Sequence, residues 1–193
     1  MPIEITTERT RLQLITLADL EMIHQLHSLP ETDKYNTLGI PKNIEETKAI
    51  IEPWISENKR KKIDNYTFAI INKGGNAFMG LFGLKLGNKK FSRGEVWYKI
   101  HRDHWNKGIA TEVLAAVIDY GFDSLNLHRI QVGCAAENIG SIKVLEKVGM
   151  IREGCGRQVL PLKTGWSDNF EYAILKTDKR KKSATKNGVN PNE

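Results

Sequence analysis

Residues 104–112, with the sequence HWNKGIATE, join a predicted strand to a predicted helix. From Gly108 onward, apolar residues recur at helical spacing, at Ala110, Val113, Leu114 and Val117. The start of a helix exposes unpaired backbone N–H groups and a partial positive charge, and small residues there let a phosphate approach. Lys107 adds a cation. The stretch predicts either an anion site or an ordinary helix start, but it has neither a P-loop nor a dinucleotide-binding fingerprint.

The segments around this stretch predict the fold class. Before it, residues 66–72 and 77–86 read as a hairpin and residues 95–100 as a third strand. After it come a strand at 129–135, a helix at about 140–148, and two more strands. Antiparallel strands followed by a strand-helix-strand-helix-strand unit predict a mixed sheet flanked by helices, in the α/β (α+β) class.

Prolines lead to two local expectations. The helix predicted to start at Asn43 contains Pro53, and an interior proline costs about 3 kcal/mol, so we expect a kink or a restart there. Pro161 and Gly165 indicate a loop between the last two strands, which we place near 150–157 and 170–176.

The charge of the chain is concentrated at one end. The sequence has 29 Lys and Arg against 23 Asp and Glu, a net charge of +6 that suggests a nucleic-acid partner. Residues 176–193 hold six basic and two acidic residues, 6 − 2 = +4, which leaves +2 for residues 1–175. Because the end segment has little apolar content, we expect one domain at 1–177 and a basic, disordered tail at 178–193.

Other compositional signals exclude several classes. No signal peptide or run of about 18 apolar residues is present, so we expect a cytoplasmic protein without membrane contact. Cys134 and Cys155 belong to no Cys/His cluster at metal-ligand spacing, so we expect neither a disulfide nor a metal. Cys134 lies in an apolar strand with no His nearby in sequence, which favours an inert thiol.

Several motifs together resemble the GNAT superfamily of acetyl-coenzyme-A-dependent N-acetyltransferases, and most closely its RimJ/RimL-like branch. The resemblance rests on six stretches in this order, namely Thr7–Leu12, Gly94–Tyr98, His104–Glu112, Asn138–Ser141, Leu145–Gly149 and Arg152–Gly154. It implies a mostly antiparallel sheet that splays between the strands at 95–100 and 129–135, with the pantetheine arm in the gap. In that branch the acceptors include N-terminal amines of ribosomal proteins.

The resemblance also implies site residues. The coenzyme would contact Tyr98, Lys99 and Ile100 on the splayed strand, the loop and helix start Trp105, Asn106, Lys107, Gly108, Ile109, Ala110 and Thr111, and Asn138 and Ser141. Glu95 is the candidate base and Ser141 the candidate proton donor to the thiolate. A backbone N–H near Tyr98 or Lys99 would hold the oxyanion. Apart from the resemblance, Trp97 fits either packing or a place in the acceptor groove, and Asp168 is a secondary candidate for binding a cationic amine there. The tyrosine that often serves as general acid is here Leu145, and Trp105 replaces the usual Gln or Arg.

Alternatives stay open for these assignments. Glu95 also fits a solvated strand end, and Asn138 or Ser141 also fits a helix cap. The acceptor amine is either a protein N-terminus or a small molecule such as a polyamine, an aminoglycoside or an amino-acid derivative. A non-catalytic ribosome- or RNA-associated module is a further alternative, and the tail would then give weak electrostatic attachment. We expect a monomer or a homodimer.

Overall fold

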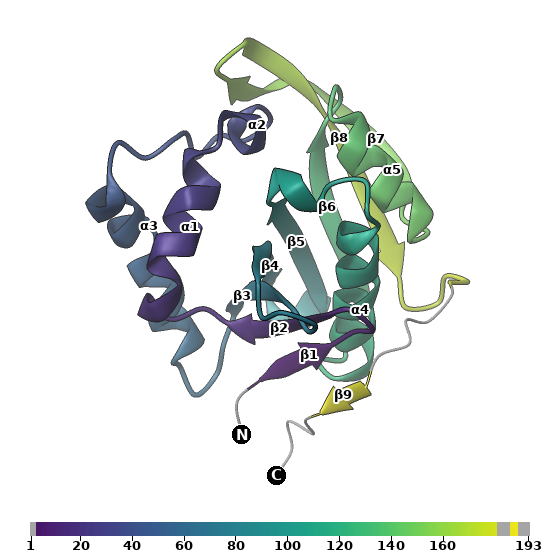
Figure 1. The fold of residues 1–193 in the computed structure, drawn as a ribbon. Helices are drawn as coiled ribbons and strands as arrows, with labels where there is room; N and C mark the ends of the chain where they lie inside the picture. The colour runs from purple at the N-terminus through teal and green to yellow at the C-terminus, as the bar shows by residue number, and fades with distance from the viewer. Residues whose placement is uncertain (1–2, 181–185, 189–193) are drawn as a thin grey trace.

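The computed structural model describes residues 3–180 and 186–188, and these form a single sheet with helices on both faces (Figure 1). The strands are β1 (Glu4–Thr6), β2 (Thr10–Leu14), β3 (Asn65–Asn72), β4 (Phe78–Leu86), β5 (Arg93–Ile100), β6 (Arg129–Ala135), β7 (Ile151–Leu162), β8 (Gly165–Leu175) and β9 (Lys186–Gly188). Their order is β7-β8-β6-β5-β4-β3-β2-β1-β9, and among these strands β5 and β6 form the one parallel pair. The mixed, mostly antiparallel sheet is confirmed.

The helices divide between the two faces of the sheet. They are α1 (Leu20–Ser28), α2 (Pro30–Asp33), α3 (Ile44–Asn58), α4 (Ile109–Asp123) and α5 (Ile139–Lys147), with short 3₁₀ helices η1 (Leu17–Asp19), η2 (Lys89–Phe91) and η3 (Arg102–His104). Figure 1 shows α1 and α3 on one face and α4 and α5 on the other.

Strand alternation gives each face its own core. On β3, Phe68 and Ile70 pack with α4, whereas Ala69 and Ile71 pack with α1 and α3. Successive side chains of a strand point to opposite faces, so one strand supplies both cores. Residues that are two positions apart on β5 therefore share a face, which becomes important at the site below.

The restart expected at Pro53 and the loop expected around Pro161 are both wrong. α3 continues through Pro53 to Asn58, because Ile51 and Ile55 on either side of it are buried and their burial offsets the lost hydrogen bond. The segment with Pro161 and Gly165 belongs to a long β7–β8 hairpin in which Pro161 pairs with Trp166. β7 is an edge strand, where a missing backbone N–H does no harm to the ladder.

The segment 178–193, which we expect to be a tail, is described only in part. The Arg180 guanidinium lies 2.8 Å from Asp119 Oδ1 and stacks over Phe122. β9 pairs with β1 in antiparallel register, Glu4 opposite Gly188. These residues are thus attached to the domain, and residues 181–185 and 189–193 lie outside the described ones.

Candidate active site

The sheet splits between β5 and β6. The two strands pair over only three positions, from Arg93 opposite Arg129 to Glu95 opposite Gln131. Beyond Glu95, β5 continues to Ile100 and β6 to Ala135 without pairing to each other, and Figure 1 shows them diverging. The predicted splay is confirmed, and Glu95 stands where it begins.

Backbone groups of β5 turn into this split. The bonds from His101 N–H to the Met79 carbonyl and from Gly87 N–H to the Arg93 carbonyl place the bonded pairs of the β4–β5 ladder at odd residues of β5. In an antiparallel ladder the residues between them point their N–H and C=O groups the other way. Tyr98 and Ile100 therefore direct their amides into the split, whereas the Lys99 amide is directed toward β4.

The loop after β5 is bent back by two left-handed residues. Asn106 has φ +57° and Gly108 has φ +75°. The Trp105 indole Nε1 donates to the Ile100 carbonyl at 2.8 Å, which fixes the loop to the end of the strand. Trp105 therefore has a structural role in closing this turn.

The first turn of α4 has open backbone donors. Its first intrahelical bond runs from Glu112 N–H to the Gly108 carbonyl, and Gly108 has no side chain to act as a cap. Ile109, Ala110 and Thr111 thus present N–H groups that donate to no acceptor among the described residues. A Cβ at Gly108 would lie 3.4 Å from Arg9 Nη2. Open amides, a left-handed glycine and an adjacent guanidinium fit the pyrophosphate of a coenzyme.

Arg9 and Thr7 hold this helix start in place. Arg9 Nε lies 2.6 Å from Glu112 Oε2, and Arg9 Nη1 donates to the Lys107 carbonyl at 2.8 Å. The Thr7 hydroxyl also donates to Glu112. Sequence reasoning used these residues only as part of a family motif, because nothing local indicates a contact between positions so far apart in the chain.

Two hydroxyl groups meet across the split. The Tyr98 hydroxyl lies 2.7 Å from Ser141 Oγ, at the start of α5. Asn138 caps that helix by accepting from the Ser141 N–H at 3.1 Å, so the Ser141 hydroxyl is not the cap. Burial raises the pKa of Tyr98 to about 12, which keeps its hydroxyl protonated at neutral pH. Tyr98 thus presents a hydroxyl to Ser141 in addition to its backbone amide.

Other residues near the hydroxyl pair are inert. Burial raises the pKa of Cys134 to about 11, so it remains a thiol, as expected. Leu145, at the position where the family often has tyrosine, is fully buried in the core.

The opposite face of β5 carries Glu95, Trp97 and Lys99. Glu95 is exposed, and Trp97 is 37% exposed and contacts Trp54 of α3 with a ring separation of 5.6 Å. The Trp97 indole lies over Gly83, where a Cβ would come within 2.0 Å of Nε1. Glu95 and the Tyr98–Ser141 pair thus lie on opposite faces of one strand, at the split.

Asp168 has a structural partner. Its Oδ1 accepts from the backbone N–H of Gln158 at 2.8 Å, and Gln158 has φ +49° in a bulge of the β7–β8 hairpin. This bond uses one carboxylate oxygen to stabilise the bulge.

Three buried polar residues lie between α1, α2 and β5, and we call them the polar cluster: His27, Asp33 and Lys99. They are 1%, 3% and 7% exposed. Asp33 Oδ2 lies 2.6 Å from Lys163 Nζ, at the turn of the β7–β8 hairpin. Sequence reasoning missed the cluster, because helix and strand patterns say nothing about which side chains meet beneath α2.

Within the cluster, His27 should make folding sensitive to acid. Burial, with the nearby charge of Lys99, lowers its pKa to about 4. The unfolded chain binds a proton near pH 6.5, so stability falls as the pH falls from 6.5 toward 4. Between pH 7 and pH 5 this amounts to about 2 kcal/mol of unfolding free energy. In urea unfolding, His27→Leu should show a smaller loss over that range, whereas the exposed control His128→Leu should match the parent. Parallel pH dependence of parent and His27→Leu would contradict the assignment.

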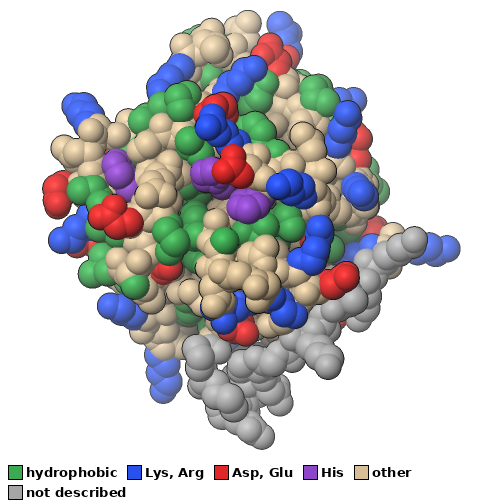
Figure 2. All heavy atoms as spheres, viewed as in Figure 1, with side chains coloured by type: hydrophobic (Ala, Val, Ile, Leu, Met, Phe, Trp, Pro, Cys, Tyr) green, Lys and Arg blue, Asp and Glu red, His purple; other side chains and the backbone are tan. Residues whose placement is uncertain are grey.

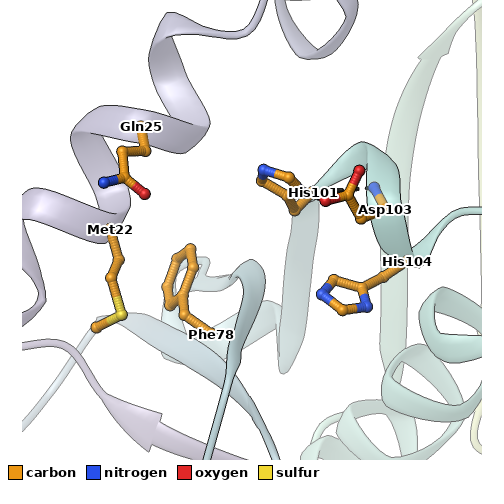
Figure 3. A pocket seen from close by; sticks show the side chains of 6 residues that line it. All are labelled: Met22, Gln25, Phe78, His101, Asp103 and His104. Atoms are coloured by element: carbon orange, nitrogen blue, oxygen red, sulfur yellow. Dashed lines mark hydrogen bonds and ion pairs between the residues drawn. The ribbon is translucent and has the colours of Figure 1, made fainter.

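A pocket of about 270 Å³ adjoins the end of β5 on the α1 side (Figure 3). Met22 and Gln25 of α1 and Phe78 of β4 line it opposite His101, Asp103 and His104. Figure 2 shows histidine side chains at the centre of this face, with Lys and Arg side chains spread among acidic and apolar ones.

Among residues 3–180 and 186–188, no group of three or more His, Cys, Asp or Glu could hold a metal. None of the described helices is long and apolar enough to cross a membrane.

A split sheet with open amides at a helix start and paired hydroxyls at the gap fits an acyltransferase that works on a coenzyme thioester. The family model described as acetyltransferase (GNAT) domain matches residues 9–151, and the chain belongs to this family. GNAT acetyltransferases use acetyl-coenzyme A. The uncharacterized N-acetyltransferase p20 of Bacillus licheniformis is 32% identical over 172 residues, 89% of this chain and 96% of that protein.

Solved structures agree on the fold. A GNAT-family acetyltransferase from Bacillus anthracis has a TM-score of 0.78 at 29% identity, over 90% of this chain and 98% of that one. A Vibrio cholerae spermidine N-acetyltransferase bound to CoA and spermine has a TM-score of 0.76 at 23% identity, covering 86% and 95%. A Vibrio fischeri ribosomal-protein-S5-alanine acetyltransferase has a TM-score of 0.77 at 21% identity, covering 93% and 100%. At these lower identities, the last two show the fold alone.

Proposed function

We propose that this N-acetyltransferase moves the acetyl group of acetyl-coenzyme A to a protein N-terminal α-amine by direct attack. The observation that carries the proposal is the Tyr98–Ser141 hydroxyl pair on one face of β5 and Glu95 on the other, at the start of the split. A base and a proton donor on opposite faces suit a reaction in which the amine approaches from one side and the thiolate leaves on the other.

The coenzyme would be held by backbone groups. The N–H groups of Ile109, Ala110 and Thr111, with the charges of Lys107 and Arg9, are suited to the pyrophosphate. Trp105, Asn106 and Gly108 shape that loop. The amides of Tyr98 and Ile100 turn toward the split, where a pantetheine arm would lie, and Asn138 borders it from α5. Acetyl-coenzyme A supplies the acetyl group as a thioester.

The residues around the split then divide the proton transfers. Glu95 takes a proton from the incoming amine, directly or through water, as the nitrogen forms the new amide bond. The Tyr98 amide is the donor aimed at the developing oxyanion. As the C–S bond breaks, the Ser141 hydroxyl donates its proton to the thiolate, whose pKa is about 8.5, and regains a proton from water. The Tyr98 hydroxyl stays protonated and orients Ser141 by donating a hydrogen bond to it. Trp97 and Asp168 border the acceptor side.

A second candidate acceptor is a polyamine. It is favoured by a relative, the spermidine N(1)-acetyltransferase of Vibrio cholerae, which is 24% identical over 143 residues, 74% of this chain and 79% of that protein. The choice is tested by following thiol release from acetyl-coenzyme A with peptides, spermidine, an aminoglycoside and amino-acid amides. Release with peptides alone supports the N-terminal acceptor, and release with spermidine alone would overturn it. Coenzyme binding with no release for any acceptor would overturn the enzymatic proposal.

Glu95→Gln should lower kcat/KM for a peptide N-terminus about tenfold at pH 7, because an α-amine with a pKa near 8 is then mostly protonated. The deficit should shrink above pH 8.5, where the amine is already neutral. The measurement is kcat/KM from pH 6.5 to 9.5, with the exposed strand carboxylate variant Glu4→Gln as control. An equal deficit at every pH would mean that Glu95 only binds the acceptor.

A further inference from the structure

The polar cluster of His27, Asp33 and Lys99 has unused hydrogen-bonding capacity. Within the described residues, His27 Nδ1, Asp33 Oδ1 and Lys99 Nζ are buried and have no hydrogen-bond partner. A buried polar atom left without a partner costs about 1–3 kcal/mol, and a charged one more. Three such atoms in one place are costly to the fold unless something binds there.

The cluster lies on the acceptor face of the split. Lys99 follows Trp97 by two residues on β5, so the two side chains share the face that carries Glu95. Lys99 also lies in the part of β5 that has no pairing to β6. α2 covers the cluster, and its Asp33 is tied to Lys163 at the hairpin turn, while Glu31 of the same helix pairs with Arg102 of η3. The cluster is thus a buried group of polar side chains beside the unpaired part of β5.

The charges of the polar cluster determine which chemical groups it can bind. His27 is neutral, since its pKa is lowered to about 4. One oxygen of Asp33 is neutralised by Lys163. Burial lowers the pKa of Lys99 to about 8, and the charge of Asp33 opposes that shift. In either protonation state Lys99 donates hydrogen bonds, and Asp33 Oδ1 accepts them.

An acceptor that has both an oxygen and an N–H group can hydrogen-bond to both Lys99 Nζ and Asp33 Oδ1. The α-amino carbonyl end of a peptide carries these groups on adjacent atoms. A polyamine carries donors and positive charges only, so it would leave Lys99 without a partner and repel it. Sites built to hydrogen-bond a substrate group strongly reject analogues that lack the group.

We propose that Lys99 binds the carbonyl oxygen next to the reacting amine and thereby selects α-amino carbonyl acceptors over simple amines and polyamines. This inference rests on the proposed acetyl transfer, and it assigns Lys99 a specificity role through its side chain. Asp33 ties α2 to the β7–β8 hairpin through Lys163, and its Oδ1 has no partner and would accept a hydrogen bond from the bound amine.

The test compares alaninamide with sec-butylamine, which has the same shape without the carbonyl, and with spermidine. We expect Lys99→Met to lower the ratio of kcat/KM for alaninamide to that for sec-butylamine at least about tenfold, mostly through KM. The ratio of kcat/KM for alaninamide to that for spermidine should also fall. Differences in amine pKa cancel, because the same amines are compared in both proteins. Lys99→Arg should keep most of the preference, and the exposed control Lys61→Met should keep all of it.

An unchanged ratio in a folded Lys99→Met that binds coenzyme A would overturn the proposal, and so would an equal loss for all three amines. If the parent transfers acetyl neither to these amines nor to a peptide N-terminus, the proposed function fails separately. Alaninamide binding to the coenzyme-A-saturated proteins then decides the role of Lys99. If the parent binds alaninamide about tenfold more tightly than Lys99→Met, the proposed role of Lys99 is supported. Equal affinities of the two proteins would overturn it.

Discussion

Gly108→Glu should weaken coenzyme A binding by about a hundredfold or more, measured by calorimetric titration. The substitution places a carboxylate at the helix start, where the N–H groups of Ile109 to Thr111 are open to the pyrophosphate. Like charges about 4 Å apart near a protein surface repel by several kcal/mol, which corresponds to this loss of affinity. The new side chain would also compete with the ligand for the same amides.

Gly39→Glu is the matched control for backbone strain. Gly39 has φ +81°, close to the +75° of Gly108, and no atom lies within 4 Å of the Cβ it would gain. Both variants pay the penalty of a side chain in the left-handed region, about 1–2 kcal/mol. Only Gly108→Glu should lose coenzyme affinity. Equal affinities in the two variants would remove the pyrophosphate from the start of α4.

Ser141→Ala should lower kcat about a hundredfold while coenzyme A affinity changes little. A positioned proton donor contributes about 10²–10⁴ to the rate, and Ala keeps the helix cap because Asn138 provides it. Tyr98→Phe should lower kcat less, since Ser141 retains its own proton but loses the partner at 2.7 Å. The double variant should be no slower than Ser141→Ala alone, because the two hydroxyls act in series.

Tyr172→Phe is the control for loss of a tyrosine hydroxyl beside α5. The Tyr172 hydroxyl donates to Glu146 at 3.3 Å, from β8. Its removal should leave kcat at the parent value, as measured by steady-state thiol release at saturating substrates. A parent-like kcat for Ser141→Ala would show that the hydroxyl pair only connects β5 to α5.

Local patterns predict the core of this fold well. The change from strand to helix spacing near Gly108 and the small residues at that point locate the start of α4 to within a residue. The prolines mislead, because their cost depends on surroundings that sequence does not show. Pro53 lies between two buried isoleucines, and Pro161 lies on an edge strand.

The candidate active site is harder to predict from local sequence patterns than the fold is. Loop 105–108 is contiguous, so its chemistry can be read from its residues. The Tyr98–Ser141 pair, the Arg9–Glu112 contact and the Asp33–Lys163 contact join residues 43, 103 and 130 positions apart. These pairs exist only because of strand order and helix placement. Likewise, β9 pairs with β1 by backbone hydrogen bonds, which composition does not reveal.

The pairing of β9 with β1 has a practical consequence for attaching this enzyme to a surface or a fusion partner. Both strands lie at the edge of the sheet opposite β7, so the two ends of the described chain are near neighbours on the side remote from the β7–β8 hairpin (Figure 1). Immobilisation through either end would leave the catalytic side facing the medium.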